Sequence, residues 1–167
     1  MKCIKKLVAL TLAAVLALAM LTACGGTPSV PETTEAAKQV VDNINAVRTE
    51  NGLPALEINT AATDVANKIA VLQGKKELNL ISEEGYKKEA RELYAIRVDG
   101  RSRDGYVATT ANSSGEKIFT KENWQKTYDK NGMGSYSQIV RNADAKYIGV
   151  AIKQISNGEY VTVVVTY

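Results

Sequence analysis

The C-terminal segment YIGVAIKQISNGEYVTVVVTY, residues Tyr147–Tyr167, decides the fold. Two runs rich in β-branched residues, Tyr147–Ile155 and Tyr160–Tyr167, flank the four residues SNGE. An Asn-Gly pair between such runs is the strongest short-range signal for a β-hairpin. The second run contains VTVVV, which is apolar on both alternating faces, so we expect both faces of that strand to be covered.

Upstream of the hairpin, apolar spacing and capping residues predict four helices. Helices that precede a sheet covered on both faces indicate an α+β domain, a three-layer α-β-α sandwich with a small antiparallel sheet. The first predicted helix has its apolar positions over Ala37–Val47, Thr33 or Thr34 as N-cap, and its end at Asn51-Gly52. The second has Asn59 or Thr60 as N-cap and stops at Gly74. The third is Ser82–Tyr94, and the fourth is 121–129 after Thr120, with Trp124 facing inward.

The connections between these helices are predicted to be irregular. After Gly74 we expect a polar link with two buried anchors, Leu78 and either Leu80 or Ile81. Val98–Arg101 has the composition of a turn, and Arg101–Ser114 that of a long exposed loop with one short strand at 106–109.

The first 23 residues have the features of a secretory signal peptide. Basic residues at positions 2, 5 and 6 precede an uncharged, mostly apolar run, Leu7–Ala23. That run could just span a bilayer, so a transmembrane anchor is the alternative. It ends in LTAC, which resembles the bacterial lipobox, whose cysteine receives a diacylglycerol thioether. We therefore predict a signal peptide over 1–23, a lipidated Cys24 with a flexible tether over 24–36, and a folded domain over 37–167.

Composition excludes several classes of function. Three of the 21 Lys and Arg residues lie in the predicted leader, which leaves 18 basic against 18 acidic residues in the mature chain. This balance gives no reason to expect nucleic acid as a partner. The chain has no histidine, and its two cysteines are Cys3 in the leader and Cys24. Histidine-based metal sites, Ser-His-Asp triads, disulfides and thiolate chemistry are therefore excluded from the mature domain.

A series of short motifs, in order along Ala37–Tyr167, resembles the CAP superfamily of cysteine-rich secretory, antigen 5 and pathogenesis-related proteins. The order of the motifs, with an apparent insertion near 74–85, carries the resemblance more than any single motif. The motifs are NAVRTENGLPAL at Asn45–Leu56, RVDG at Arg97–Gly100, GEKI at Gly115–Ile118, Trp124, SYSQIV at Ser135–Val140 and YIGV at Tyr147–Val150.

The resemblance implies an α-β-α sandwich with a central cleft that carries two histidines and two glutamates, often around a divalent cation. Carried over residue by residue, the histidine positions fall on Ala95 and Ser135, and the glutamate positions on Glu116 and Thr127. One ligand of four is kept, at Glu116. We therefore expect a degenerate cleft with no metal, no cofactor and no catalytic residue.

Two cleft positions have competing interpretations. Glu116 either orients a ligand or pairs locally as a structural carboxylate. Ser135 lacks a histidine base and an S-x-x-K motif, so an N-cap is favoured over a nucleophile. Its neighbour Tyr136 is expected in the core.

The remaining singled-out residues are expected to be structural. Arg48 is typical of the family and is favoured as a structural residue over a ligand-binding one. Asp99 and Asp104 are expected to be turn residues, which gives glycosidase chemistry little support. The arginines at 97, 101 and 103 could meet a phosphate, although a solvated loop neutralised by the two aspartates is favoured.

These observations predict an extracellular lipoprotein, secreted through its signal peptide and anchored by Cys24 to the outer face of the cell membrane. Its degenerate domain is expected to bind an envelope component, a lipid or a partner protein. Two alternatives stay open. One is a cell-envelope hydrolase that uses Glu116 with a lysine or tyrosine, and the other is a structural or decoy domain with a filled cleft.

Overall fold

The computed structural model describes residues 34–132 and 134–167, which lie in one compact unit. The predicted signal peptide, Cys24 and most of the tether lie outside these residues. The helices are α2 (Glu35–Glu50), α3 (Thr60–Glu77), α4 (Glu83–Tyr94), α5 (Gly115–Ile118), α6 (Lys121–Asp129) and α7 (Ser135–Arg141). The strands are β1 (Glu57–Ile58), β2 (Gly105–Ala111), β3 (Tyr147–Gln154) and β4 (Tyr160–Thr166).

The four strands form one sheet in the order β1-β3-β4-β2. β3 and β4 pair antiparallel from Ile148 opposite Thr166 to Gln154 opposite Tyr160, which confirms the predicted hairpin. Gly158 in its turn has φ +89°, a conformation that glycine adopts at no steric cost. β2 pairs antiparallel with the other side of β4, while the short β1 pairs parallel with β3.

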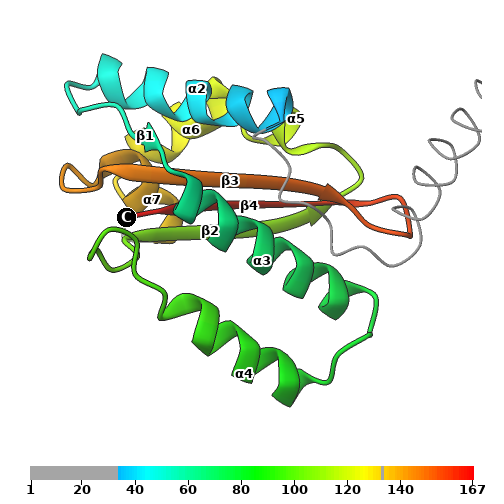
Figure 1. Cartoon of the computed structure of the whole chain (residues 1–167). Helices are drawn as coiled ribbons and strands as arrows, with labels where there is room; N and C mark the ends of the chain where they lie inside the picture. Colours follow the sequence, from blue (N-terminus) through cyan, green and yellow to red (C-terminus); the bar gives the residue numbers. More distant parts are fainter. Residues whose placement is uncertain (1–33, 133) are drawn as a thin grey trace, which may run out of the picture. The chain divides into compact units, whose positions relative to one another are not determined.

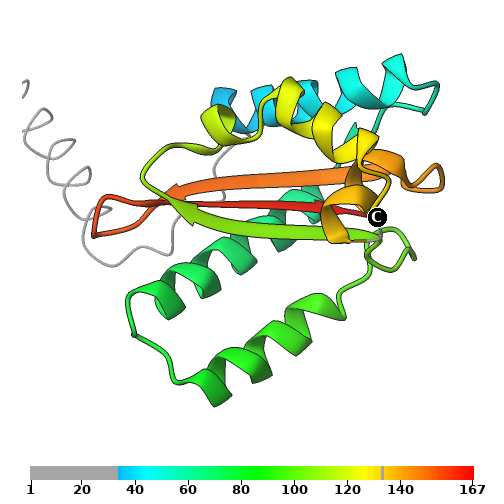
Figure 2. The same ribbon diagram turned by 180° about the vertical axis from the view of Figure 1, so that it is seen from behind.

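Helices cover both faces of the sheet, as the sequence predicts (Figure 1). α2, α5 and α6 lie on one face and α3 and α4 on the other, and the view from behind shows the same layers (Figure 2). The VTVVV run is fully buried, with Val161, Val163 and Val165 in the core under α3 and Val164 in the core under α2. Burial of both faces is why that strand needs no polar alternation.

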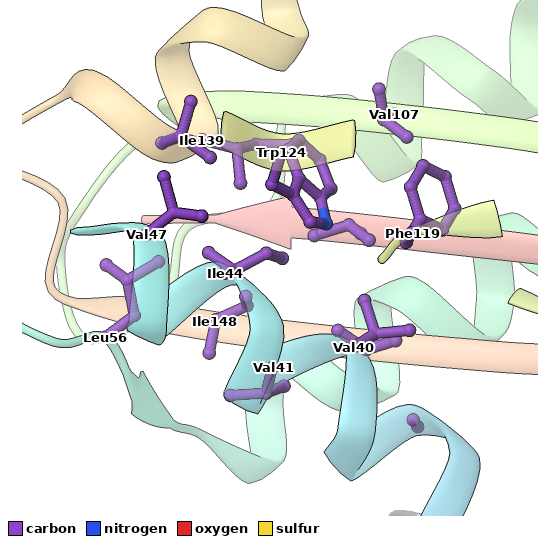
Figure 3. Close-up of a cluster of buried hydrophobic side chains, with 14 of the residues drawn as sticks. Val40, Val41, Ile44, Val47, Leu56, Val107, Phe119, Trp124, Ile139 and Ile148 are labelled. Carbon is purple, nitrogen blue, oxygen red and sulfur yellow. The ribbon is translucent and has the colours of Figure 1, made fainter. Parts of the chain in front are cut away.

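The core under α2 is built around Trp124, whose exposed fraction is 1 % (Figure 3). Its ring stacks on Phe119 at 5.4 Å between centroids with an interplanar angle of 19°. Ile44 from α2 and Ile139 from α7 belong to the same cluster. The predicted inward orientation of Trp124 is confirmed.

The capping residues expected from the sequence start the four longest helices. The side chain of Thr34 accepts a hydrogen bond from the Ala37 amide, and Asn59, Ser82 and Thr120 do the same for the amide three residues on. Each side-chain cap satisfies a backbone N–H that has no partner inside the helix.

The predicted end of the second helix is wrong. α3 continues through Gly74 to Glu77. Gly74 is buried because Ile155 approaches it closely, and a Cβ there would lie 2.9 Å from Ile155 Cγ2. Of the predicted anchors, Leu80 is 72 % exposed, and Leu78 and Ile81 are only half-buried, so none of them serves as a core anchor in this link.

The predicted exposed loop over Arg101–Ser114 is also largely wrong. β2 runs over seven residues, because β4 supplies pairing partners from Gly105 to Ala111 that no local pattern reveals. The turn before it is confirmed, since Val98 and Arg101 bridge across Asp99 and Gly100, which have φ +47° and +78°.

A glycine on β3 fixes how closely α3 approaches the sheet. A Cβ at Gly149 would lie 2.2 Å from the backbone carbonyl of Ala62. We expect Gly149→Ala to lower the free energy of unfolding by about 3 kcal/mol, at the upper end of overpacking, because the helix must move away from the strand. Urea unfolding followed by fluorescence of the single tryptophan, Trp124, measures this loss.

Gly132→Ala is the matched control, because nothing lies within 4 Å of a Cβ built there. We expect the control to change stability by less than about 0.5 kcal/mol. Equal losses for the two variants would contradict the close approach of α3 to β3.

Candidate functional site

The four positions that correspond to the family's cleft lie on four different helices. Ala95 is the exposed C-cap of α4, which packs against α3. Glu116 and Thr127 are half-buried on α5 and α6, and Ser135 is the exposed first residue of α7. Within residues 34–132 and 134–167, no hydrogen bond or ion pair joins any two of these positions.

Glu116 is engaged locally. Its carboxylate accepts a hydrogen bond from the hydroxyl of Ser114, the N-cap residue of α5. A carboxylate in the first turn also suits the positive end of a helix. This contact supports a role for Glu116, which is half-buried, in forming the short helix.

The hydroxyls at the other two helical positions differ in their surroundings. Thr127 donates to the carbonyl of Asn123 at 3.0 Å, one turn back in α6. The predicted N-cap role of Ser135 is wrong, because Gly134 is the N-cap of α7 and no side chain caps that helix. Gly134 takes the extended conformation, with φ −83° and ψ 168°, so the helix begins one residue earlier than a serine cap would place it.

The donors present do not fit a divalent cation. In the described part of the chain, no three His, Cys, Asp or Glu side chains come close enough together to hold a metal ion. Of the four cleft positions only Glu116 carries a charged oxygen, and Ala95 carries no ligand atom at all. Zinc needs three or four protein ligands and calcium needs six to eight oxygens, so one engaged carboxylate is insufficient.

An aromatic platform, which we define as Phe119, Trp124 and Tyr136, stands beside Ser135. Tyr136 is 43 % exposed, so its predicted place in the core is wrong. Its ring centroid lies 5.8 Å from Trp124 and 6.3 Å from Phe119. Burial of part of the ring raises the pKa of the Tyr136 phenol, which is therefore a neutral donor. The platform thus presents one accessible ring supported by two buried ones.

Arg48 on α2 is bonded to α7, the helix that carries Ser135 and Tyr136. Its guanidinium is fully buried, and its Nε and Nη1 donate to the carbonyls of Pro54 at 2.9 Å and Ile139 at 3.0 Å. Burial lowers the pKa of Arg48. The bond to Ile139 joins α2 to α7, and the bond to Pro54 holds the segment that follows α2, which supports the structural interpretation of this residue.

The three arginines after α4 behave differently from one another. Arg97 donates twice to the carbonyl of Gly100, and Arg101 donates to the carbonyl of Asp144 at 2.9 Å. Both are exposed, as expected for a solvated loop. Arg103 is half-buried, with its Cζ 4.2 Å from the centroid of the Tyr94 ring, so the solvated-loop interpretation is wrong for it.

The sequence analysis missed the tyrosines that surround Arg103. Tyr94 lies 5.0 Å from Tyr106 between ring centroids, and Tyr86 donates to the side chain of Gln73 at 3.0 Å. A signal was available, because Tyr86, Ala90 and Tyr94 follow one another at four-residue spacing and therefore share one face of α4.

No helix in the described residues is long and apolar enough to span a bilayer. This finding does not extend to the leader, which lies outside them.

Comparison with known proteins identifies the fold. The model of the cysteine-rich secretory protein family, CAP, matches residues 41–167. An outer surface protein from Borrelia burgdorferi has a similar structure, with a TM-score of 0.51 and 20 % identity over 81 % of this chain and 94 % of that one. The CAP domain of Enterococcal PrgA has a TM-score of 0.50 and 13 % identity over 77 % of this chain and 58 % of that one. A comparison with curated proteins finds no significant match.

Tyr86 on α4 makes stability depend on pH in the alkaline range. Burial first, and then the neighbouring Tyr94, raise the pKa of Tyr86 to about 12 from an unfolded value of 10.0. A raised folded pKa means that the unfolded chain loses its proton first, so this contribution to stability is complete below pH 10.0 and is lost as pH rises towards about 12. We expect Tyr86→Phe to reduce the fall in unfolding free energy across that window. Urea titrations at several alkaline pH values measure it, and an equally steep fall in the variant would contradict the assignment.

Proposed function

We propose, because this chain belongs to the cysteine-rich secretory protein (CAP) family, that its domain acts by binding and not by catalysis. The observation that carries this proposal is the set of residues at the family's cleft positions. Alanine, threonine and serine occupy three of the four, and the remaining Glu116 is tied to Ser114. With no histidine in the chain, the cleft lacks the imidazoles that would bind a metal or move a proton at neutral pH.

The binding surface is the aromatic platform together with Glu116. An exposed tyrosine ring backed by buried aromatics is a rigid contact surface with little conformational entropy to lose on binding. Glu116, on the short helix that directly precedes Phe119, adds an acceptor for hydroxyl or amide donors. This combination suits a ligand rich in hydroxyl and amide groups, such as a glycan-peptide polymer of the cell envelope, better than a purely apolar lipid.

The location proposed for this activity is the outer face of the cell membrane. The leader, with its LTAC motif at Leu21–Cys24, supports secretion and lipidation of Cys24. One protein of similar fold is described as an outer surface protein, which agrees with this location.

Loss of the exposed ring should weaken binding. We expect Tyr136→Ala to reduce co-sedimentation of the protein with purified peptidoglycan by about tenfold, since removing an aromatic anchor typically costs more than about 1 kcal/mol. Gln138→Ala is the control, because Gln138 is exposed on the same helix. Retention of Tyr136→Ala equal to that of the control would contradict the proposed surface.

The isosteric variant Glu116→Gln, which keeps an acceptor for the Ser114 hydroxyl, distinguishes the alternative of a hydrolase from the proposed binding domain. If the domain binds only, this variant loses at most a few-fold in affinity, and neither it nor the unmodified protein releases soluble fragments from peptidoglycan. Fragment release that depends on Glu116 would overturn the proposal. Failure to bind any envelope fraction would instead favour the structural or decoy role.

Anchoring is tested separately. We expect Cys24→Ala to move the protein from the membrane fraction to the soluble fraction, because one thioether carries the lipid that holds it there. Cell fractionation and metabolic labelling with a fatty acid measure this change. Continued membrane association of the variant would show that the apolar run spans the bilayer.

A further inference from the structure

We propose that Arg103 and the tyrosines around it form a site for an oxyanion, the phosphate or carboxylate group of a ligand, between α4 and β2. This site is separate from the aromatic platform and does not depend on the proposed function. We call it the Arg103 site and define it as Arg103, Tyr94, Tyr106 and Tyr167.

The guanidinium is held in place by ring faces. Its Cζ lies 4.2 Å from the centroid of Tyr94 and 5.2 Å from that of Tyr106, and the two rings are inclined at 55° to each other. Cation–π contacts orient a guanidinium while leaving its N–H edges unused. Tyr94 ends α4 and Tyr106 lies near the start of β2, so the site bridges an element of the helical layer and the edge of the sheet.

Arg103 has no hydrogen-bonding partner among the described residues. It makes neither a hydrogen bond nor an ion pair there, and its Nη1 is closed off from solvent. By contrast, the arginines at 48, 97, 101 and 141 each donate to a backbone carbonyl. A buried donor left unpaired is costly, and the fork of a guanidinium matches the two oxygens of a carboxylate or phosphate.

Tyr167 supplies a second donor at the same place. Its side chain has an exposed fraction of 0 %, and its hydroxyl has no hydrogen-bond partner within the described ranges. Tyr167 belongs to the buried cluster against which Tyr94 and Tyr106, the two rings beside Arg103, are packed. Burial raises the pKa of Tyr167. Burial also raises the pKa of Tyr106, so both phenols are protonated donors at neutral pH.

The acidic residues of the same loop are directed elsewhere. Asp99 accepts a hydrogen bond from Asn59 Nδ2 at 3.0 Å. Burial raises the pKa of Asp104, and the charges that act on it come from Arg101 and Asp144. The charge of Arg103 is therefore not neutralised by the aspartates that flank it in the sequence, and an external oxyanion would supply the missing partner.

The test is an NMR titration of the full chain in neutral detergent micelles, following the guanidinium N–H signals of Arg103. Inorganic phosphate and acetate are the two probes, and the one that binds with the higher affinity shows which oxyanion the site prefers. We expect saturable shifts at Arg103 with at least one probe. Arg103→Met should weaken that binding by at least about tenfold, because charged hydrogen bonds are lost, whereas Arg91→Met, at an exposed position on α4, should not.

Arg103→Lys, which keeps the charge, is the second variant and serves if Arg103→Met fails to fold. We expect it also to bind at least about tenfold more weakly, because an ammonium cannot present two parallel N–H bonds. The proposal is overturned if neither probe gives a saturable shift, or if the lysine variant binds like the unmodified protein. Because Glu116 and Tyr136 are unchanged in these variants, peptidoglycan binding reports the proposed function independently.

Discussion

The structure depends on one constraint, the burial of both faces of β4. A strand whose valines point in both directions can be stable only if helices cover it on each side. Val161, Val163 and Val165 require α3, and Val164 requires α2 and the helices packed on it. The hairpin places β3 on one side of this strand, and β2 pairs with its other side. The three layers follow from the demands of one apolar strand.

Within that frame, two polar features set what the surface can do. Arg48 is buried at the α2–α7 contact, where its bond to the carbonyl of Ile139 joins α2 to the helix that carries Ser135 and Tyr136. Alanine and serine at two of the cleft positions offer no imidazole to a metal, while the stacked Phe119 and Trp124 support the ring of Tyr136. In our proposal the domain offers an accessible aromatic surface and no inorganic centre, and that is why binding is the activity we favour.

The sequence predicted those parts of the fold whose signals are local. The hairpin, the four side-chain caps and the inward orientation of Trp124 depend on neighbouring residues, and all are confirmed. Most errors arose where a distant segment decides, although the local prediction of a cap at Ser135 also failed. β2 exists because β4 pairs with it, and α3 runs through Gly74 because Ile155 packs there. Tyr136 lies on the exposed side of α7 with Ser135 and Gln138, while the buried side of that helix is formed by Ser137, Ile139 and Val140. The environment of Arg103 joins α4 to β2, and no spacing in the sequence relates two such elements.

The most direct test of the central claim, that this cleft works without a metal, is a zinc titration of the protein followed by NMR. The signals to follow are the backbone amides of Ala95, Glu116, Thr127 and Ser135. We predict that zinc leaves all four amides unshifted, since a single carboxylate already bonded to Ser114 cannot hold the ion. Saturable shifts at these amides with micromolar affinity would contradict the claim, because they would require a metal centre built from ligands other than the family's histidines.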